Sequence, residues 1–255
     1  MLGRSLLIVA TAALCLAAGS SAGGSVAALS DEFDDATLAG WQQMQGDATV
    51  DPARVSAAGG VLTIHSAHAS WVREQRAYYI WKDVAGDFSV TTRVKVTGES
   101  AETPTADWSL AGLLVRRPDT DRSHESWIGW TTGGVSSKQV FERKTTTRST
   151  SILELQPART GWLELRVVRL GAVFLLLHRY PDGGWLYDGQ YRRPDLPKTV
   201  EVGIDAQSGW GVDFADLVAH VDYVRFAETG LPRALRAKLQ HTYVVSRSVL
   251  RYVTR

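Results

Sequence analysis

Apolar and polar residues alternate with a period of two through most of this chain. In GDFSVTTRVKV, at 86–96, every second position from the phenylalanine onward belongs to one face, which is apolar except for a threonine. That face carries Phe88, Val90, Thr92, Val94 and Val96. Because side chains on a strand point to opposite faces in turn, the pattern predicts a strand with one buried and one solvent-facing side, as in antiparallel sheets.

Comparable strands recur along the chain between turns that contain Gly, Pro or Asp. The further strands are predicted at 59–66, 110–117, 126–130, 199–206 and 218–226. The stretch 162–180 predicts a hairpin that turns near Gly171, with Leu163, Leu165 and Val167 facing inward. Residues 31–228 lack helical periodicity, and about a dozen short strands predict an all-β domain, a two-sheet antiparallel β-sandwich.

Two tryptophans in the strand ESWIGWTTGG lie three positions apart, so they are predicted to point to opposite faces of one sheet. Ile128 shares the face of Trp130, which favours the core for that ring. Gly129 shares the face of Trp127 and leaves room above the sheet. We therefore expect Trp127 to be the outward, accessible ring.

The pattern changes after residue 228. TGLPRALRAKLQ places Leu231, Leu235 and Leu239 on one helical face, with Pro232 near the first turn. Residues 229–255 carry six basic residues and no acid. The tail is predicted to be a basic amphipathic helix that contacts an anionic surface weakly, or a segment that packs on the domain or is disordered.

The N-terminal 27 residues have the pattern of a secretory signal peptide. One basic residue precedes the apolar run SLLIVATAALCLAAG, and small residues follow, with cleavage expected after Ala22 or Ala27. A membrane anchor is the alternative, but the run is shorter than the ~20 residues that span a bilayer. We expect a secreted, extracellular or periplasmic protein whose sandwich occupies residues 28–228.

Composition excludes several classes of function. Cys15 is the only cysteine and lies in the expected signal peptide, so no disulfide, cysteine nucleophile or thiolate metal site is expected in the mature chain. The chain has 28 basic and 27 acidic residues, but the basic surplus lies in the tail and residues 23–228 are net acidic. An acidic body with a basic tail does not indicate a nucleic-acid-binding domain.

Seven motifs follow one another over residues 31–228. They are DEFDD…GW (31–41), GGVLTI (59–64), W…YYIWKDVAGDFSVTTRV (71–94), AGLLVRRPD (111–119), SWIGW (126–130), WLELRVVRLGAVFLLLHRYPDGGW (162–185) and VDYVRF (221–226). In this order they resemble the jelly-roll domains of the concanavalin A-like lectin/glucanase superfamily. They are most similar to a secreted bacterial family of largely unknown function that is similar to the C-terminal module of β-xylosidases. The resemblance implies two face-to-face sheets, a concave one with a glycan-binding or catalytic groove, and pairing of the first and last strands.

Known catalytic patterns are missing from the sequence. The Glu-x-Asp-x-x-Glu strand of laminarinase-like hydrolases of this superfamily is absent, and Glu201 and Asp205 are interpreted as solvated strand residues. No His-Glu-x-x-His motif occurs, and residues 28–228 contain no Gly-x-Ser-x-Gly nucleophile elbow. The acidic cluster at 118–125 is compatible with calcium, but a solvated loop is favoured. The chain contains no asparagine, which the metal-dependent sugar site of legume-type lectins uses. We expect no metal site and no cofactor.

The nine tryptophans are the remaining candidate chemistry, because indole rings stack on the apolar faces of sugars. The candidate carbohydrate-binding residues are Trp71, Trp81, Trp108, Trp127, Arg116, Glu142 and Trp185. Ordinary core packing is the alternative for each ring, and solvated surface charge is the alternative for Arg116, Glu142 and Arg143.

These patterns together favour a secreted, non-catalytic, lectin-like module that binds a polysaccharide or other glycan on its concave sheet, and that is monomeric. One alternative is a glycoside hydrolase or lyase with an unrecognised carboxylate pair. Another is a structural or adhesive protein of the cell envelope.

Overall fold

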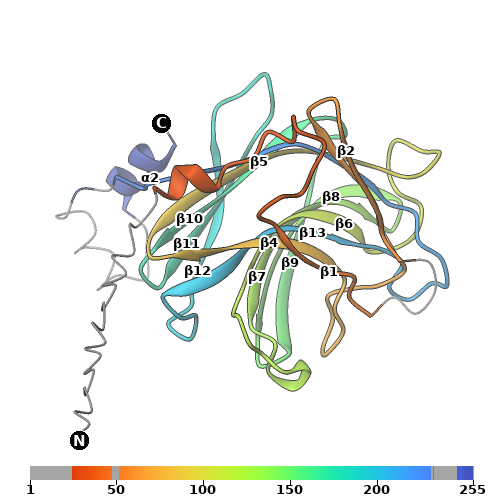
Figure 1. The fold of residues 1–255 in the computed structure, drawn as a ribbon, viewed down its shortest axis with the longest axis horizontal. Coiled ribbons are helices and arrows are strands. Elements are labelled where there is room, and N and C mark those ends of the chain that lie inside the picture. The colour runs from red at the N-terminus through yellow and green to blue at the C-terminus, as the bar shows by residue number, and fades with distance from the viewer. Residues whose placement is uncertain (1–24, 48–51, 231, 233–245, 255) are drawn as a thin grey trace, which may run out of the picture.

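Two antiparallel seven-stranded sheets pack face to face in the computed structural model, which describes residues 25–47, 52–230, 232 and 246–254 (Figure 1). The predicted all-β sandwich is therefore confirmed. Residues 1–24, most of the expected signal peptide, lie outside the described residues, as does most of the helix predicted near 231–239. Within the described part of the chain, no helix has the length and apolar character needed to span a membrane.

One sheet, called the front sheet here, carries the candidate site. Its order is β1 (Gln42–Met44), β4 (Tyr78–Ala85), β13 (Thr199–Gln207), β6 (Ser109–Arg116), β7 (Trp127–Val135), β8 (Lys138–Thr147) and β9 (Thr150–Pro157). The back sheet has the order β12 (Leu186–Arg192), β11 (Val173–Arg179), β10 (Leu163–Leu170), β5 (Phe88–Thr97), β14 (Val218–Ala227), β3 (Val61–His65) and β2 (Arg54–Ala58).

The core between the sheets follows the period-two pattern. The predicted apolar face of β5 is buried, and Leu163, Leu165 and Val167 of the β10–β11 hairpin pack beside it. Trp130 lies in this core, and its indole Nε1 donates a hydrogen bond to the Leu177 carbonyl at 2.8 Å. That bond satisfies the one polar atom of a ring that is otherwise fully buried.

Two glycines in the middle of the front sheet are required by close approach of the strands. A Cβ added to Gly112 would lie 2.5 Å from the Trp130 carbonyl oxygen, and one added to Gly203 would lie 1.8 Å from that of Ile80. Both distances are shorter than real Cβ contacts, so no larger residue fits without a shift of the backbone. The sheet consequently has positions without side chains near its centre.

The first and last segments of the sandwich pair on β14 of the back sheet. Asp31 forms an antiparallel bridge with Val224, and both backbone N–H···O bonds measure 2.8 Å. This confirms the implied pairing of the first and last segments. The short 3₁₀-helix η1 (Val26–Leu29) precedes the bridge, and a second, η2 (Arg122–His124), lies between β6 and β7.

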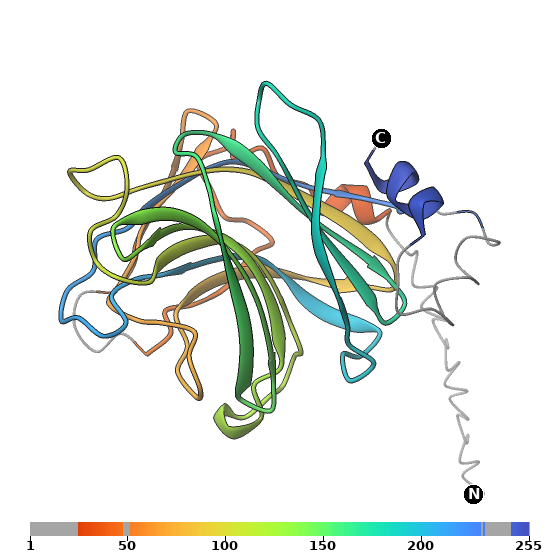
Figure 2. The ribbon, with the colours of Figure 1, turned by 180° about the vertical axis from the view of Figure 1, so that it is seen from behind.

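The helix α2 (Arg247–Val253) lies later in the tail than the predicted one and packs on the outer face of the back sheet. Its buried residues Val249 and Val253 contact an apolar cluster that includes Leu175 and Leu177. The Ser246 side chain caps its N-terminus. In both views of the ribbon, α2 lies at the same end of the molecule as η1 (Figures 1 and 2). At least this part of the tail is packed on the domain.

Candidate functional site

The outer face of the front sheet is covered by residues 66–77, the connection between β3 and β4, which we call the strap. The strap is held from two different strands. Gln207 Oε1, on β13, accepts a hydrogen bond from the Trp71 backbone N–H at 2.8 Å, and Lys144 Nζ, on β8, donates to the Trp71 carbonyl at 2.6 Å. The peptide groups of Trp71 are therefore bound by side chains of the sheet below it.

Trp127 and Trp130 point to opposite faces of β7, as predicted, but the prediction that Trp127 is accessible is wrong. Trp127 is only 2% exposed. The Trp71 ring packs edge-on against it at 5.8 Å between centroids, and Lys144 Nζ lies 5.3 Å from its centroid. The space above Gly129 is taken by the Trp127 ring itself, which lies 3.4 Å from where a Cβ of Gly129 would be.

Trp71 and Trp81 belong to the same aromatic cluster. Trp71 is 1% exposed and packs edge-on against Tyr79, while the partly buried Trp81 stacks on Tyr79 at 5.1 Å. The structure thus brings three of the predicted tryptophans together, but in a packed cluster under the strap. The rings of Trp71 and Trp127 are not presented to solvent in this conformation, and that of Trp81 is partly buried.

Arg116 is a buried structural cation, contrary to the interpretation of a solvated charge. Its guanidinium donates two 2.9 Å hydrogen bonds to Glu125 and one of 2.6 Å to Glu201. Arg76, at the end of the strap, also pairs with Glu125. Glu201, expected to be solvated, is buried, and burial raises its pKa although Arg116 opposes the shift. With its donors committed in this way, Arg116 is not positioned to bind a ligand here.

Two further carboxyl groups, Asp205 and Glu142, lie buried on the same face of the sheet. The interpretation of Asp205 as a solvated strand residue is therefore wrong, and so is the alternative of a solvated charge for Glu142. They occupy one cross-strand row, in which Asp205 pairs with Gly112, Gly112 with Thr131, and Thr131 with Glu142. Burial raises the pKa of Glu142, with Lys144 opposing. Burial also raises the pKa of Asp205 well above its ordinary range, and the charge of Glu142 adds to the shift.

Several polar atoms beneath the strap lack partners. The Gln207 side chain lies close enough to Glu142 to lower the pKa of that carboxyl group, and so it links the row to the bound strap. In the part of the chain that the structure describes, five buried atoms of the strap and of the row make no hydrogen bond: Ser70 Oγ, Trp71 Nε1, Thr131 Oγ1, Glu142 Oε2 and Asp205 Oδ1. Buried polar groups are normally paired, so a local group of orphaned ones indicates a place where a polar ligand or water binds.

An aromatic pocket opens at the edge of the strap. It has a volume of about 230 Å³ and is lined by Ser70, Trp71, Val72, Trp108, Lys144, Leu153, Gln207 and Trp210. Trp210 is 46% exposed and meets Trp108 edge-on at 6.3 Å. Among the predicted tryptophans, Trp108 is the one that faces this accessible space together with Trp71.

Trp210 is the site residue that the sequence analysis missed. A signal for it exists in the loop SGWG, because an aromatic residue between two glycines lies outside any alternating strand pattern. Trp185 is the opposite case. It packs near α2, between the guanidinium groups of Arg166 at 3.8 Å and Arg179 at 4.8 Å, on the outer side of the back sheet. It does not join the other candidates.

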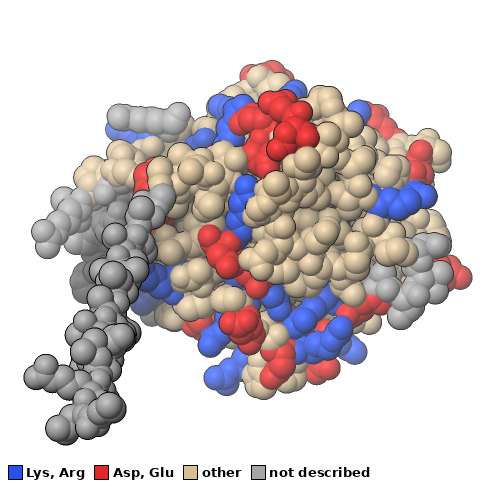
Figure 3. All heavy atoms as spheres, in the orientation of Figure 1, with Lys and Arg blue, Asp and Glu red and all other residues tan. Residues whose placement is uncertain are grey.

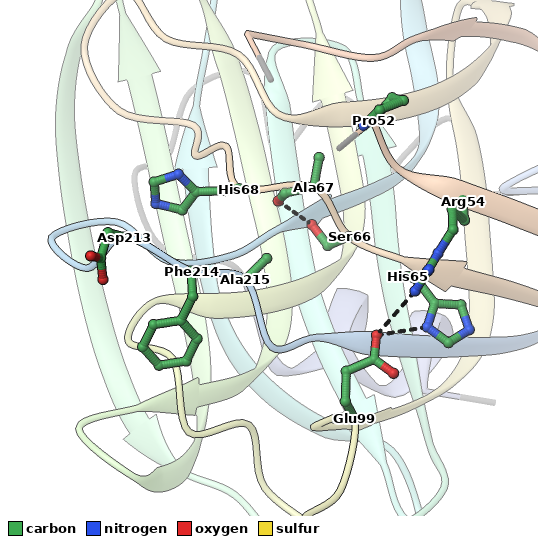
Figure 4. A pocket seen from close by; sticks show the side chains of 10 residues that line it. All are labelled: Pro52, Arg54, His65, Ser66, Ala67, His68, Glu99, Asp213, Phe214 and Ala215. Atoms are coloured by element: carbon green, nitrogen blue, oxygen red, sulfur yellow. Dashed lines mark hydrogen bonds and ion pairs between the residues drawn. The ribbon is translucent and has the colours of Figure 1, made fainter. Parts of the chain in front are cut away.

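A second cavity, of about 840 Å³, is lined by Ser66, Ala67 and His68 at the start of the strap together with residues of neighbouring segments (Figure 4). Its charged groups already pair with one another. His65 Nδ1 lies 2.8 Å from Glu99 Oε1, and Arg54 lies 3.6 Å from the same oxygen. His68 donates to the Gly209 carbonyl at 2.8 Å. This cavity lacks the pair of edge-on indoles that marks the aromatic pocket.

The acidic loop at 118–125 does not assemble its side chains. Asp121 and His124 are exposed and contact each other, whereas Glu125 is buried against Arg116. Over the described residues, no three His, Cys, Asp or Glu side chains are grouped so that they could hold a metal ion.

Comparisons with known proteins identify the fold. No family model matches the sequence, and no curated protein matches it. Among solved structures, a functionally unknown protein from Saccharomyces cerevisiae is 16% identical with a TM-score of 0.58, covering 74% of this chain and 96% of that one. The GH43 BlXynB protein from Bacillus licheniformis is 16% identical with a TM-score of 0.62, covering 78% of this chain and 39% of its own.

A beta-1,3-glucanase from Mycobacterium marinum is 15% identical with a TM-score of 0.50, covering 77% of this chain and 97% of that one. At these identities the likeness concerns the fold alone. It is consistent with the two-sheet antiparallel β-sandwich. The chain spans well under half of the GH43 chain. The resemblance to one particular secreted bacterial family stays a prediction.

Proposed function

We propose that the protein binds a carbohydrate in the aromatic pocket of the front face, with one sugar ring against Trp108 and Trp210. The observation that carries the proposal is the half-exposed Trp210 ring beside Trp108, above the polar atoms of Lys144 and Gln207. Indole faces stack on the C–H faces of a sugar, and the two polar side chains are donors and acceptors for its hydroxyl groups.

Two further observations support this assignment. The pocket is mostly apolar with a few placed polar groups, which is the general form of a small-ligand site. On the surface that faces the viewer in Figure 3, acidic and basic side chains lie near one another. The names of the Bacillus and Mycobacterium neighbours, a GH43 protein and a beta-1,3-glucanase, refer to carbohydrate-active proteins.

The partner in this proposal is a polysaccharide or glycan, bound without catalysis by a secreted monomer. Secretion rests on the signal-like pattern of residues 1–27. A weak contact of the basic tail with an anionic surface belongs to the same proposal and rests on the charge of residues 229–255.

Retention of the purified full-length protein on insoluble polysaccharides tests the proposal. Trp210→Ala removes the exposed stacking surface and is expected to lower retention at least fivefold, with an unchanged circular dichroism spectrum. Tyr187→Ala, at an exposed aromatic residue on β12 of the back sheet, is the matched control and is expected to bind as wild type. Equal retention of the Trp210 and wild-type proteins would remove the pocket from consideration.

A glycoside hydrolase is the second candidate, favoured by the Asp205–Glu142 row. Only Gly112 and Thr131 stand between the two carboxyl groups on this face. The strands that carry them are three intervals apart, roughly 14 Å between Cα atoms at ~4.8 Å per interval, and their side chains extend over the same face. Inverting glycosidases place their two carboxyl groups about 6.5–9.5 Å apart. New reducing ends released from a retained polysaccharide, and lost in Asp205→Asn and Glu142→Gln, would favour this candidate over simple binding.

A further inference from the structure

We propose that the front face contains a second subsite, occupied by Trp71 in this conformation, that binds the secondary amide of an acetamido sugar when the strap is displaced. The proposal rests on the proposed carbohydrate binding and names its substrate class. The adjoining aromatic pocket would hold a neighbouring sugar of the same chain.

The first step of the argument is the way in which the sheet binds Trp71. The two side chains hold one acceptor and one donor toward a peptide: Gln207 Oε1 accepts from the Trp71 N–H at 2.8 Å, and Lys144 Nζ donates to the Trp71 carbonyl at 2.6 Å. An acetamido group presents the same two functions, an N–H and a C=O. A hydroxyl group presents neither a fixed N–H donor nor a carbonyl. The pair is therefore complementary to an amide rather than to an unsubstituted sugar.

The second step is the apolar surface beneath Trp71. Its indole packs on the rings of Tyr79 and Trp127, at centroid distances of 6.1 and 5.8 Å. If the Trp71 side chain leaves, these two rings form an aromatic floor beside the amide-binding pair. Such a floor suits the methyl group of an acetamide and the C–H face of a pyranose ring.

The third step is the set of unpaired atoms around the strap. Thr131 Oγ1, Glu142 Oε2 and Asp205 Oδ1 are buried without a hydrogen-bond partner in the described structure, and all three residues lie in the row next to Lys144 and Gln207. The closed strap leaves them unsatisfied, which costs free energy. Sugar hydroxyl groups entering in place of Trp71 would pair with them, so a ligand gains contacts that the strap does not supply.

The geometry of the strap also fits displacement. Trp71 is deeply inserted, but the next turn is largely solvent-facing, with Arg73, Glu74 and Gln75 exposed. Arg73 has a left-handed backbone conformation, with φ at +55°. Removing the Trp71 indole therefore frees the subsite without disturbing the core between the sheets. It also lowers the free energy that ligand binding must supply to displace the strap.

Calorimetric titration with two soluble tetrasaccharides of identical β-1,4 linkage tests the proposal. They are the N-acetylglucosamine tetramer and the glucose tetramer, which differ only in the acetamido group. Wild type is expected to bind the acetamido tetramer roughly tenfold more tightly, the order of magnitude of one hydrogen bond to a charged donor. Trp71→Ala is expected to increase that affinity further, and Lys144→Met to bring the two ligands within twofold of each other.

Equal affinity of the folded wild type for the two tetramers would overturn the acetamide assignment, and so would weaker binding by a folded Trp71→Ala. N-acetylalanine methylamide serves as a competitor, and displacement of the sugar by it at equal concentration would point to a peptide site and refute the sugar class. If Lys144→Met unfolds, Gln207→Met replaces it, and thermal melts establish which variant is folded. Failure of both tetramers to bind, together with no retention on any polysaccharide, would instead refute the proposed function.

Discussion

Replacing Arg116 by methionine tests whether this residue is structural, as its contacts indicate, or a ligand-binding residue, as its sequence position favoured. The substitution keeps a long side chain but removes the cation that neutralises Glu125 and Glu201. Both carboxylates are buried, and Glu125 retains only Arg76, from the strap, as an ion-pair partner. We expect a folded protein with strongly reduced stability.

The magnitude follows from the environment. Removing one partner of a buried ion pair costs about 3–5 kcal/mol, because an uncompensated charge stays buried. Since two carboxylates depend on Arg116, we expect the upper half of that range. For a domain of this size, about 1 kcal/mol corresponds to roughly 2–4 °C in Tm, so the melting temperature should fall by roughly 8–20 °C at neutral pH.

The loss should depend on pH in a defined direction. Burial already raises the pKa of Glu201, and Arg116 opposes that shift. In the variant the opposing charge is gone, so the folded-state pKa rises further above the unfolded value of about 4.3. When the pKa of a carboxyl group is higher in the folded than in the unfolded protein, the group does not lower the free energy of unfolding at pH values below the unfolded pKa. As the pH rises above that value, ionisation lowers the free energy of unfolding progressively. The difference between variant and wild type should therefore be larger at pH 7.5 than at pH 4.

Thermal and urea unfolding followed by circular dichroism measure the effect. Arg117→Met is the matched control, because Arg117 is exposed and donates one hydrogen bond, to the Asp195 carbonyl at 3.1 Å. It should change stability by less than about 0.5 kcal/mol. A loss below about 1 kcal/mol in Arg116→Met, or one of equal size at both pH values, would refute the account of a buried, charge-compensating cation.

Other contacts give independent tests. Asp205→Asn should raise Tm at pH 7.5 and leave it unchanged at pH 4, since burial raises the pKa of Asp205 and its ionisation at higher pH costs stability; a lower Tm at pH 7.5 would contradict this. Gly112→Ala should lose about 1–3 kcal/mol in urea unfolding, because its Cβ would lie 2.5 Å from the Trp130 carbonyl oxygen; wild-type stability would show that the strands can separate. Val249→Asp should detach α2 from Leu175 and its neighbours, increasing binding of a hydrophobic dye while the sandwich still unfolds cooperatively; an unchanged dye signal would contradict that packing.

Alternation along the chain was sufficient to predict many of the strands, among them β3, β5, β6, β10, β11, β13 and β14, and the face on which their side chains lie. The β10–β11 hairpin with its turn at Gly171, the buried face of β5, and the opposite orientations of Trp127 and Trp130 all follow from it. This success has a physical reason. The period of two is a property of the extended backbone itself, so it holds whatever lies on either side of the sheet.

Exposure was decided by the tertiary structure. Trp127 was placed on the correct face, yet the strap, which is remote in sequence, brings Trp71 over it. Glu201 and Asp205 were interpreted as solvated because charged residues usually are, but both are buried, and the charged groups near them come from other strands.

The carboxylate row likewise depends on the order of strands in the sheet. Asp205 and Glu142 face the same row only because β6 and β7 lie between β13 and β8. Local pattern determines the direction of a side chain, whereas burial and partnership depend on which distant segment packs above it. The period of a strand carries no information about which distant segment packs above it. The covered site, with Trp210 at its rim, could therefore be identified only from the folded chain.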